Sequence, residues 1–353
     1  MKKSEVVIIL LIVAALLSCP TPNPASSPAK SWVVSTLAGD GVANFRNGAG
    51  ASARFNSPFD VEVDSSGNVY VADYINHRIR KITPEGEVST FAGSGQSGTQ
   101  NGAAETAQFH YPNDVATDSS GNVYVVEPHS HWIRKITPEG EVSTFAGSGQ
   151  SGTQNGAAGS AQFHYPDGVA TDSSGNVYVA DTSNNLIRKI IPQGEVSTFA
   201  GSGQSGTQNG AAGSAQFNSP RGITVDSSGN VYVADSGNNL IRRITPGGEV
   251  STFAGSGTAG DENGAAGEAQ FNIPTGVTTD SSGNVYVADS GNNLIRRITP
   301  GGEVSTFAGS GQAGDENGAA GEAQFRYPTG VATDSSGNVY VADKDNHRIR
   351  KIE

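Results

Sequence analysis

Two histidines separated by one residue form the tightest local group of potential metal ligands in the chain. His129 and His131 flank Ser130, and in an extended segment this spacing places both imidazoles on the same side. Such a pair could supply two ligands to zinc or copper. No third ligand is evident, so a surface turn is the alternative interpretation, and we expect no bound cofactor.

Two acidic loops offer the oxygen atoms that calcium prefers. They are Asp261-Glu262-Asn263-Gly264 and Asp315-Glu316-Asn317-Gly318, with Glu268 and Glu322 beyond them. Neither has the regular ligand spacing of an EF-hand loop. We interpret both as solvated acidic loops and keep calcium binding as the alternative.

Five glycine-rich loops formally match the GxGxxG pattern of dinucleotide-binding proteins. They begin at Gly93, Gly147, Gly201, Gly255 and Gly309. In those proteins the loop opens a helix whose N-terminus meets the pyrophosphate, whereas no helical periodicity follows any of these loops. The pattern therefore reflects loop composition. A Gly-x-Ser-x-Gly nucleophile motif does not occur either.

The single cysteine has a sequence context of its own. Lys2 and Lys3 precede an apolar run from Val6 to Leu17 that is too short to span a bilayer as a helix. The following Leu-Leu-Ser-Cys19 resembles the lipobox of bacterial lipoproteins, which implies that Cys19 is lipidated and becomes the mature N-terminus. We expect a signal peptide at 1–18, a proline-rich tether at 19–30, and export to the cell envelope, with the outer membrane or cell surface favoured.

Charge and cysteine content exclude several classes of protein. The chain has 353 residues, with 22 Lys and Arg against 34 Asp and Glu and a net charge of −12. This balance opposes binding to nucleic acid backbones. One cysteine excludes a disulfide framework and a zinc site of the CxxC type.

A 54-residue repeat organises the rest of the chain. The string DSSGNVY starts at Asp64, Asp118, Asp172, Asp226, Asp280 and Asp334 without insertion or deletion. Each unit contains short β-branched runs bounded by Gly, Asn, Asp and Pro, which predict four antiparallel strands joined by tight turns. A recurrent Phe before the first strand should pin the long connection between units.

The two ends of the repeat region predict ring closure. The last unit stops at Glu353 after its third strand, while the segment 32–39 matches the missing fourth strand. Pairing of these two ends would complete one sheet and leave no open array ends. We therefore predict an all-β, six-bladed β-propeller over residues 31–353, and a monomer.

The repeat also resembles a known family. The segment from Pro328 to Ile352 is similar to the NHL repeat, and the pairs Asn76-His77 and Asn346-His347 fall where NHL repeats often carry these residues. The resemblance extends over all six units. It implies a propeller, but propellers of this type include lyases, lactonases, RNA-binding proteins and sensor domains, so the fold does not select a function.

Candidate binding residues are those that break the repeat near the central channel. In propellers the first strand of each blade lines the channel, and the longest loops share one face. The residues after the Pro that opens this strand differ between blades 1 to 4. The candidates there are Asp60, Asn113, Asp114, Asp167 and Arg221.

Blade 2 departs most from the repeat. It replaces the common Ala-Asp turn with a segment that contains Glu127, His129, His131 and Trp132. An exposed Trp beside two His and a Glu would suit a binding face. The alternative is drift in a tolerant loop.

These features support two functional hypotheses. The first is a non-enzymatic binding module, anchored to the membrane through Cys19, whose loop face binds a protein, peptide or glycan at the cell envelope. The second is a metal-assisted lyase or lactonase with a site on the axis, for which Asp60, Asp114, Asp167, His110 and His164 are the candidates. The absence of a triad favours the first.

Overall fold

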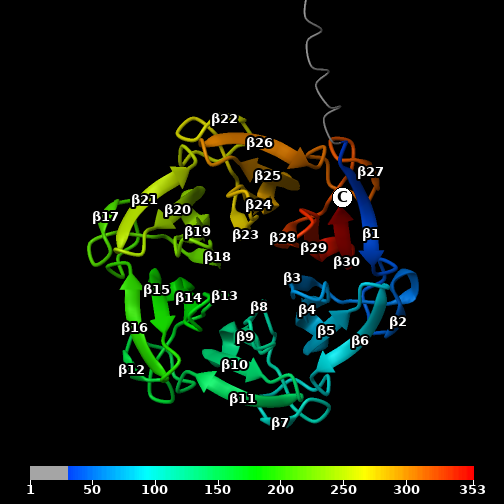
Figure 1. The fold of residues 1–353 in the computed structure, drawn as a ribbon, viewed down its shortest axis with the longest axis horizontal. Coiled ribbons are helices and arrows are strands. Elements are labelled where there is room, and N and C mark those ends of the chain that lie inside the picture. The colour runs from blue at the N-terminus through cyan, green and yellow to red at the C-terminus, as the bar shows by residue number, and fades with distance from the viewer. Residues whose placement is uncertain (1–30) are drawn as a thin grey trace, which may run out of the picture. The chain divides into compact units, whose positions relative to one another are not determined.

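Residues 31–353, which the computed structural model describes, form six β-sheets arranged as a ring (Figure 1). The innermost strand of each sheet faces the axis. These strands are β3 (Pro58–Val63), β8 (Asp114–Thr117), β13 (Gly168–Thr171), β18 (Pro220–Val225), β23 (Pro274–Thr279) and β28 (Pro328–Thr333). The predicted six-bladed propeller is confirmed.

Two further strands per blade follow in antiparallel order. The second strands are β4 (Val69–Asp73), β9 (Val123–Glu127), β14 (Val177–Asp181), β19 (Val231–Asp235), β24 (Val285–Asp289) and β29 (Val339–Asp343). The third strands are β5 (Arg78–Ile82), β10 (Trp132–Ile136), β15 (Leu186–Ile190), β20 (Leu240–Ile244), β25 (Leu294–Ile298) and β30 (Arg348–Ile352). Short 3-10 turns join the second strand to the third: η2 (Tyr74–Asn76), η3 (Pro128–Ser130), η4 (Thr182–Asn184), η5 (Ser236–Asn238), η6 (Ser290–Asn292) and η7 (Lys344–Asn346).

Each sheet has five strands, one more than predicted. The fourth strands are β6 (Glu87–Ala92), β11 (Glu141–Ala146), β16 (Glu195–Ala200), β21 (Glu249–Ala254), β26 (Glu303–Ala308) and β1 (Val33–Ala38). The fifth are two-residue strands in the connections: β2 (Gly48–Ala49), β7 (Gly102–Ala103), β12 (Gly156–Ala157), β17 (Gly210–Ala211), β22 (Gly264–Ala265) and β27 (Gly318–Ala319). A Gly-Ala pair has no strand propensity of its own, so only pairing with the fourth strand makes it one. Another 3-10 turn, η1 (Gly50–Ser52), follows β2.

The ring closes as the sequence predicts. Strand β1 pairs with β30, with Val34 opposite Ile352 and Thr36 opposite Arg350, and it also pairs with β27. The blue β1 and the red β30 lie side by side in Figure 1. The two ends of the described chain therefore share one sheet, which removes the free edges of an open array.

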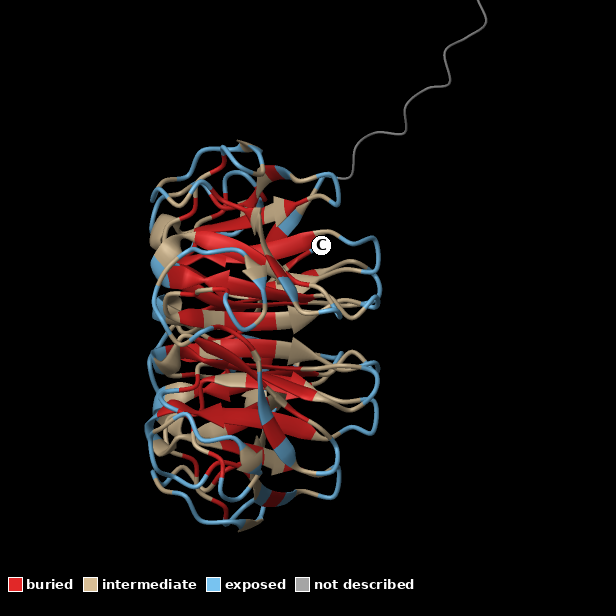
Figure 2. Ribbon diagram, turned by 90° about the vertical axis from the view of Figure 1, so that its left-hand side faces the viewer, coloured by how far each residue is buried: buried red, intermediate tan, exposed pale blue. Residues whose placement is uncertain are grey.

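The hydrophobic cores lie between neighbouring blades. On β4, Val71 packs in a cluster with Tyr340 of the last blade, whereas Tyr70 packs in a cluster with Val123 and Phe109 of the next. Alternate side chains of one strand thus face opposite neighbours. Figure 2 shows the ring edge-on, with buried strands between two layers of exposed loops.

A buried ion pair recurs in every blade. It joins an acid at the end of the second strand to an Arg of the third, and both side chains are 0% exposed. The pairs are Asp73–Arg80, Glu127–Arg134, Asp181–Arg188, Asp235–Arg242, Asp289–Arg296 and Asp343–Arg350, at 2.7–3.0 Å. The repeated Phe is also buried, and each guanidinium lies over it at 5.0–5.3 Å from the ring centroid.

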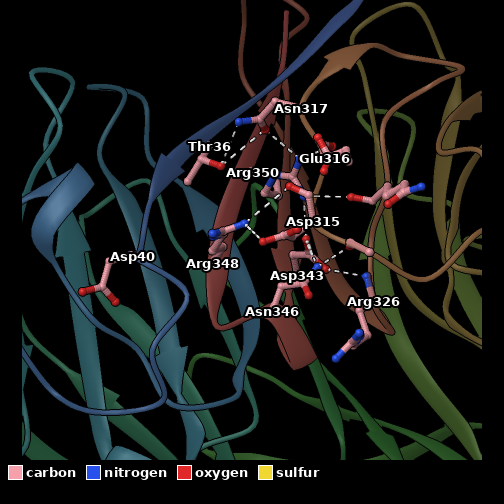
Figure 3. A network of polar contacts seen from close by, with 12 residues as sticks. Thr36, Asp40, Asp315, Glu316, Asn317, Arg326, Asp343, Asn346, Arg348 and Arg350 are labelled. Atoms are coloured by element: carbon pink, nitrogen blue, oxygen red, sulfur yellow. Dashed lines mark hydrogen bonds and ion pairs between the residues drawn. The ribbon is translucent and has the colours of Figure 1, made fainter.

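The last blade shows the whole network (Figure 3). Arg350 donates to Asp343, to the Asn317 side chain and to the carbonyls of Glu316 and Gln324. Asp343 also accepts from the Arg326 backbone N–H and from the Asn346 side chain. The pair therefore fixes the long connection to the sheet.

A second repeated contact latches each blade to the next. Its acceptor is either a His, through Nδ1, or an Asn, through Oδ1, just after the 3-10 turn. His131 accepts the Tyr165 N–H at 3.2 Å, and Asn185 accepts the Ser219 N–H at 2.9 Å. Burial lowers the pKa of His131, with a smaller effect from His164, which favours the neutral acceptor form. The Asn-His pair of the repeat is therefore structural at this position.

Several features predicted near the N-terminus lie outside the described residues. These are the signal peptide at 1–18, the lipidated Cys19 and the tether at 19–30, and they stay predictions. Within the described residues 31–353, no helix has the length and apolar character needed to cross a membrane.

We predict that loss of one partner of a buried ion pair destabilises the ring strongly. Arg188→Met leaves Asp181 as an unpaired buried charge, so the free energy of unfolding should fall by about 3–5 kcal/mol. Urea denaturation measures this. Lys189→Met, on the same strand but half-buried, is the control and should change stability by less than about 1 kcal/mol. Equal effects of both changes would contradict the role of the pair.

Candidate functional site

The axis of the ring contains a cavity of about 220 Å³. The innermost strands line it, and its surface is mostly polar, with Thr hydroxyls and three carboxyl groups, whereas the side chains of Val115 and Val169 pack in the cores between blades. The carboxyl groups belong to Asp60 and Glu62 on β3 and to Asp114 on β8. All three therefore come from two adjacent blades, which gives the cavity one acidic side.

The loop-face end of the axis is nearly closed. A pocket of only about 20 Å³ remains there. Its lining includes five of the predicted binding residues: Asp60, Asn113, Asp114, Asp167 and Arg221. The structure thus brings together the residues that break the repeat at the channel mouth. Asp60 and Asp114 line both spaces and separate them.

Hydrogen bonds between neighbouring blades seal this mouth. Thr329 donates to the Phe59 carbonyl at 2.5 Å, and Thr275 donates to the Thr329 carbonyl at 2.9 Å. On the other side of the mouth, Asn113 donates to both the carbonyl and the carboxylate of Asp167 at 3.0 Å. A ligand on this face therefore meets a closed rim.

The Asp167 carboxylate holds a second neighbour at the same mouth. The Arg221 Nε lies 3.4 Å from Asp167 Oδ2. Burial raises the pKa of Asp167 to about 6, although Arg221 acts to lower it. Asp167 and Arg221 are thus engaged with each other and with Asn113, so they serve to close the rim.

Burial raises the pKa values of the axial carboxyl groups. The pKa of Asp60 rises to about 7 and that of Glu62 to about 8, and for Glu62 the charge of Asp60 adds to the effect of burial. Burial and the neighbouring Asp60 also raise the pKa of Asp114. In their protonated forms these groups can act as hydrogen-bond donors inside the cavity.

No group of three or more His, Cys, Asp or Glu side chains among residues 31–353 is arranged to hold a metal ion. His129 lies in the turn η3 and His131 follows it in the left-handed region, so they do not share one side of an extended segment as predicted. His131 serves as a latch to the next blade. His129 remains exposed beside tyrosines of the loop face.

Two blade 2 residues expected on the binding face belong to the scaffold. Glu127 is 0% exposed because it replaces the repeated Asp in the ion pair with Arg134. Trp132 is half-buried and packs against the connection at Gly147 and Gly149. The expectation of an exposed Trp is therefore wrong, and Glu127, proposed as a binding residue, is buried because its longer side chain still reaches the repeated Arg.

The structure reveals an arc of aromatic rings that the sequence interpretation missed. We call it the rim arc: Phe59, Tyr74, Tyr111, His129 and Tyr165. Successive ring centroids lie 5.6, 5.0, 5.1 and 4.9 Å apart. The arc spans blades 1 to 3 on the loop face. A comparison of the six units identifies the tyrosines that precede the first-strand proline. That their rings form one continuous row follows only from the arrangement of the blades around the axis.

The family model described as "NHL repeat" matches residues 55–82, 163–190, 217–244, 271–298 and 325–352. The chain carries five NHL repeats. The sequence predicted a resemblance over six units, and five of them match the family model. The second unit, which contains Glu127 and the altered turn, is not among the matched ranges.

Two curated proteins are similar to this chain at about 30% identity. The protein SUPPRESSOR OF QUENCHING 1 of Arabidopsis thaliana is 31% identical over 74% of this chain, and NHL repeat-containing protein 2 of Bos taurus is 30% identical over 84% of it. The chain spans only 26% and 46% of the lengths of these two proteins.

Solved structures show the same fold. An auxiliary nutrient binding protein from Bacteroides ovatus superposes with a TM-score of 0.70 at 18% identity, over 92% of this chain and 76% of that chain. A virginiamycin B lyase from Staphylococcus aureus gives a TM-score of 0.51 at 18% identity, over 83% and 78%. At this identity the likeness describes the fold alone.

We predict that Glu62 makes the stability of the NHL propeller depend on pH. Its pKa rises from the ordinary 4.5 to about 8 on folding, so its contribution is fully present below pH 4.5 and is lost as the pH rises through about 8. Glu62→Gln stays neutral. Its melting temperature should match that of the unsubstituted protein at pH 4 and exceed it at pH 9.

The control for this prediction is Glu141→Gln on the outer strand β11, where the side chain is exposed. This change should leave the difference between pH 4 and pH 9 as it is in the unsubstituted protein. A Glu62→Gln protein with an unchanged pH profile would show that Glu62 titrates normally in the folded ring.

Proposed function

We propose that this protein is a binding protein of the bacterial cell envelope, exported and anchored through a lipid on Cys19. The propeller presents its loop face, and the rim arc binds the ligand. The observation that carries this proposal is the rim arc, an unbroken row of aromatic side chains on the loop face.

The contrast between blades supports a binding role for one side of this face. The residue before the first-strand proline is Tyr in blades 2, 3 and 6, Ser in blades 1 and 4, and Ile in blade 5. At the first position of the 3-10 turn, Tyr74 of blade 1 corresponds to Ser236 and Ser290 in blades 4 and 5. Because the backbone is the same in each case, the scaffold does not require the rings.

The sealed axis favours binding on the surface. The mouth leaves about 20 Å³ of space, and Asn113, Thr275 and Thr329 there already form hydrogen bonds to neighbouring blades. A small-molecule pocket is ordinarily several hundred Å³ in volume. The ligand should therefore lie across the rim. The likeness to a protein from Bacteroides ovatus that is described as an auxiliary nutrient binding protein supports a binding role for this fold.

Capture from bacterial envelope extract tests the site. Full-length protein should retain envelope material that is lost in the double variant Tyr111→Ser/Tyr165→Ser, because Ser removes two neighbouring rings of the arc. Serine occupies the equivalent position at Ser57 and Ser219, so the fold should tolerate it. The retained material is analysed for both protein and carbohydrate by mass spectrometry.

The matched control is Ile273→Ser, which changes the same repeat position on blade 5, away from the arc. It should retain as much material as the unsubstituted protein. Retention that is equal in all three proteins would rule out the rim arc as the binding surface.

The anchor has a separate test. In a bacterial host, the unsubstituted protein should fractionate with membranes and incorporate labelled fatty acid, whereas Cys19→Ala should do neither, because it lacks the thiol that would carry the lipid. A Cys19→Ala protein that remains in the membrane fraction with an unchanged label would contradict lipid anchoring. Circular dichroism checks that the propeller is folded in both.

A further inference from the structure

Two tyrosines of the rim arc lie at a repeat position where the backbone is in the left-handed region in every blade. Tyr111 and Tyr165 have φ angles of 55° and 53°, in the left-handed region that costs an L-residue roughly 1–2 kcal/mol. The latch hydrogen bond holds that backbone in all six blades. Ser57, Ser219, Ile273 and Tyr327 have the same left-handed φ, so the backbone does not require tyrosine and the side chain at this position is free to differ between blades.

The rings of the arc are available on the surface. Tyr165 is 40% exposed and His129 is also exposed, while Tyr74 and Tyr111 are half-buried. Tyrosine and histidine combine a ring face with a polar edge that donates or accepts hydrogen bonds. The arc therefore suits a ligand that has apolar faces and polar edges itself.

The rest of the surface narrows the class of ligand. Large exposed hydrophobic side chains in the described chain are few: Val33, Val42, Ile75, Tyr165 and Ile273. Tyr165 belongs to the arc and Ile75 follows its member Tyr74, so this side of the loop face carries a row of rings and not the broad apolar centre of a stable protein interface. Single-stranded nucleic acids also stack on aromatic rings but need a basic groove, and this chain has a net charge of −12.

We infer that the rim arc binds a neutral carbohydrate chain, whose sugar rings stack along Tyr111, His129 and Tyr165. This inference rests on the proposed binding function and names its ligand class. A sugar ring has apolar C–H faces and hydroxyl edges, which match the ring faces and polar atoms of the arc. A neutral chain also avoids repulsion from the acidic body of the protein.

Calorimetry with defined oligosaccharides tests the inference. The probes are linear oligomers of glucose, mannose, xylose and N-acetylglucosamine, with a uronic acid oligomer as the charged comparison. At least one neutral oligomer should bind the full-length protein, with an affinity that changes little with salt because the ligand carries no charge. Tyr165→Ser should weaken that binding about tenfold.

Two further variants keep the result interpretable. His129→Ser copies Ser183 of blade 3 at an exposed turn position and should weaken binding without affecting folding. Ile273→Ser, on the far side of the ring, should bind as the unsubstituted protein does. Equal losses in Ile273→Ser and Tyr165→Ser would overturn the assignment to the arc.

The outcome also separates this inference from the proposed function. If no neutral oligomer binds, or only the uronic acid oligomer binds, the inferred ligand class is wrong. Arc-dependent capture of envelope material would still support the binding function in that case. If neither the oligomers nor envelope material depends on the arc, both proposals fail.

Discussion

The buried ion pair between the second and third strands is the interaction on which the rest of the ring depends. Each Arg is fully buried and contacts an acid, an Asn and carbonyls of the long connection at once. A buried charge of this kind needs hydrogen-bonding partners; both terminal nitrogens of each guanidinium have them, whereas its buried Nε has none among the described residues. The pair therefore fixes the long connection to the blade in all six units. Because this contact is the same in each blade, the loop face has a regular geometry.

A rigid repeated scaffold leaves a few positions free to differ. The latch between blades needs only a backbone N–H from the residue before the proline, and Ser, Ile and Tyr all supply it. The side chain at that position can then vary without loss of the contact. In blades 2 and 3 it is Tyr, which builds the rim arc, whereas the axial acids lie behind a mouth closed by hydrogen bonds. The loop surface thus presents aromatic rings, whereas the axis contains carboxyl groups.

Local patterns predicted the strands well but did not indicate the environment of several side chains. Arg80 and its equivalents are each followed by Lys or Arg, a charged pair that is typical of an exposed strand, and their full burial depends on acids seven residues earlier. Glu127 stands out in the alignment of units, yet it keeps the ion pair of its sister residue Asp181. The fifth strand was missed because two residues of Gly and Ala carry no pattern of their own.

The sequence by itself determined the period, the number of blades and the closure of the ring, because the repeat has no insertions and its two ends are complementary. It also identified the residues at the channel mouth. Only the tertiary structure decided what these residues do. Positions 54 residues apart become neighbours when the blades turn about one axis, so Asp60 and Asp114 share a cavity and Tyr111 and Tyr165 share an arc. Distances between such side chains depend on the curvature of the ring, which no local pattern contains.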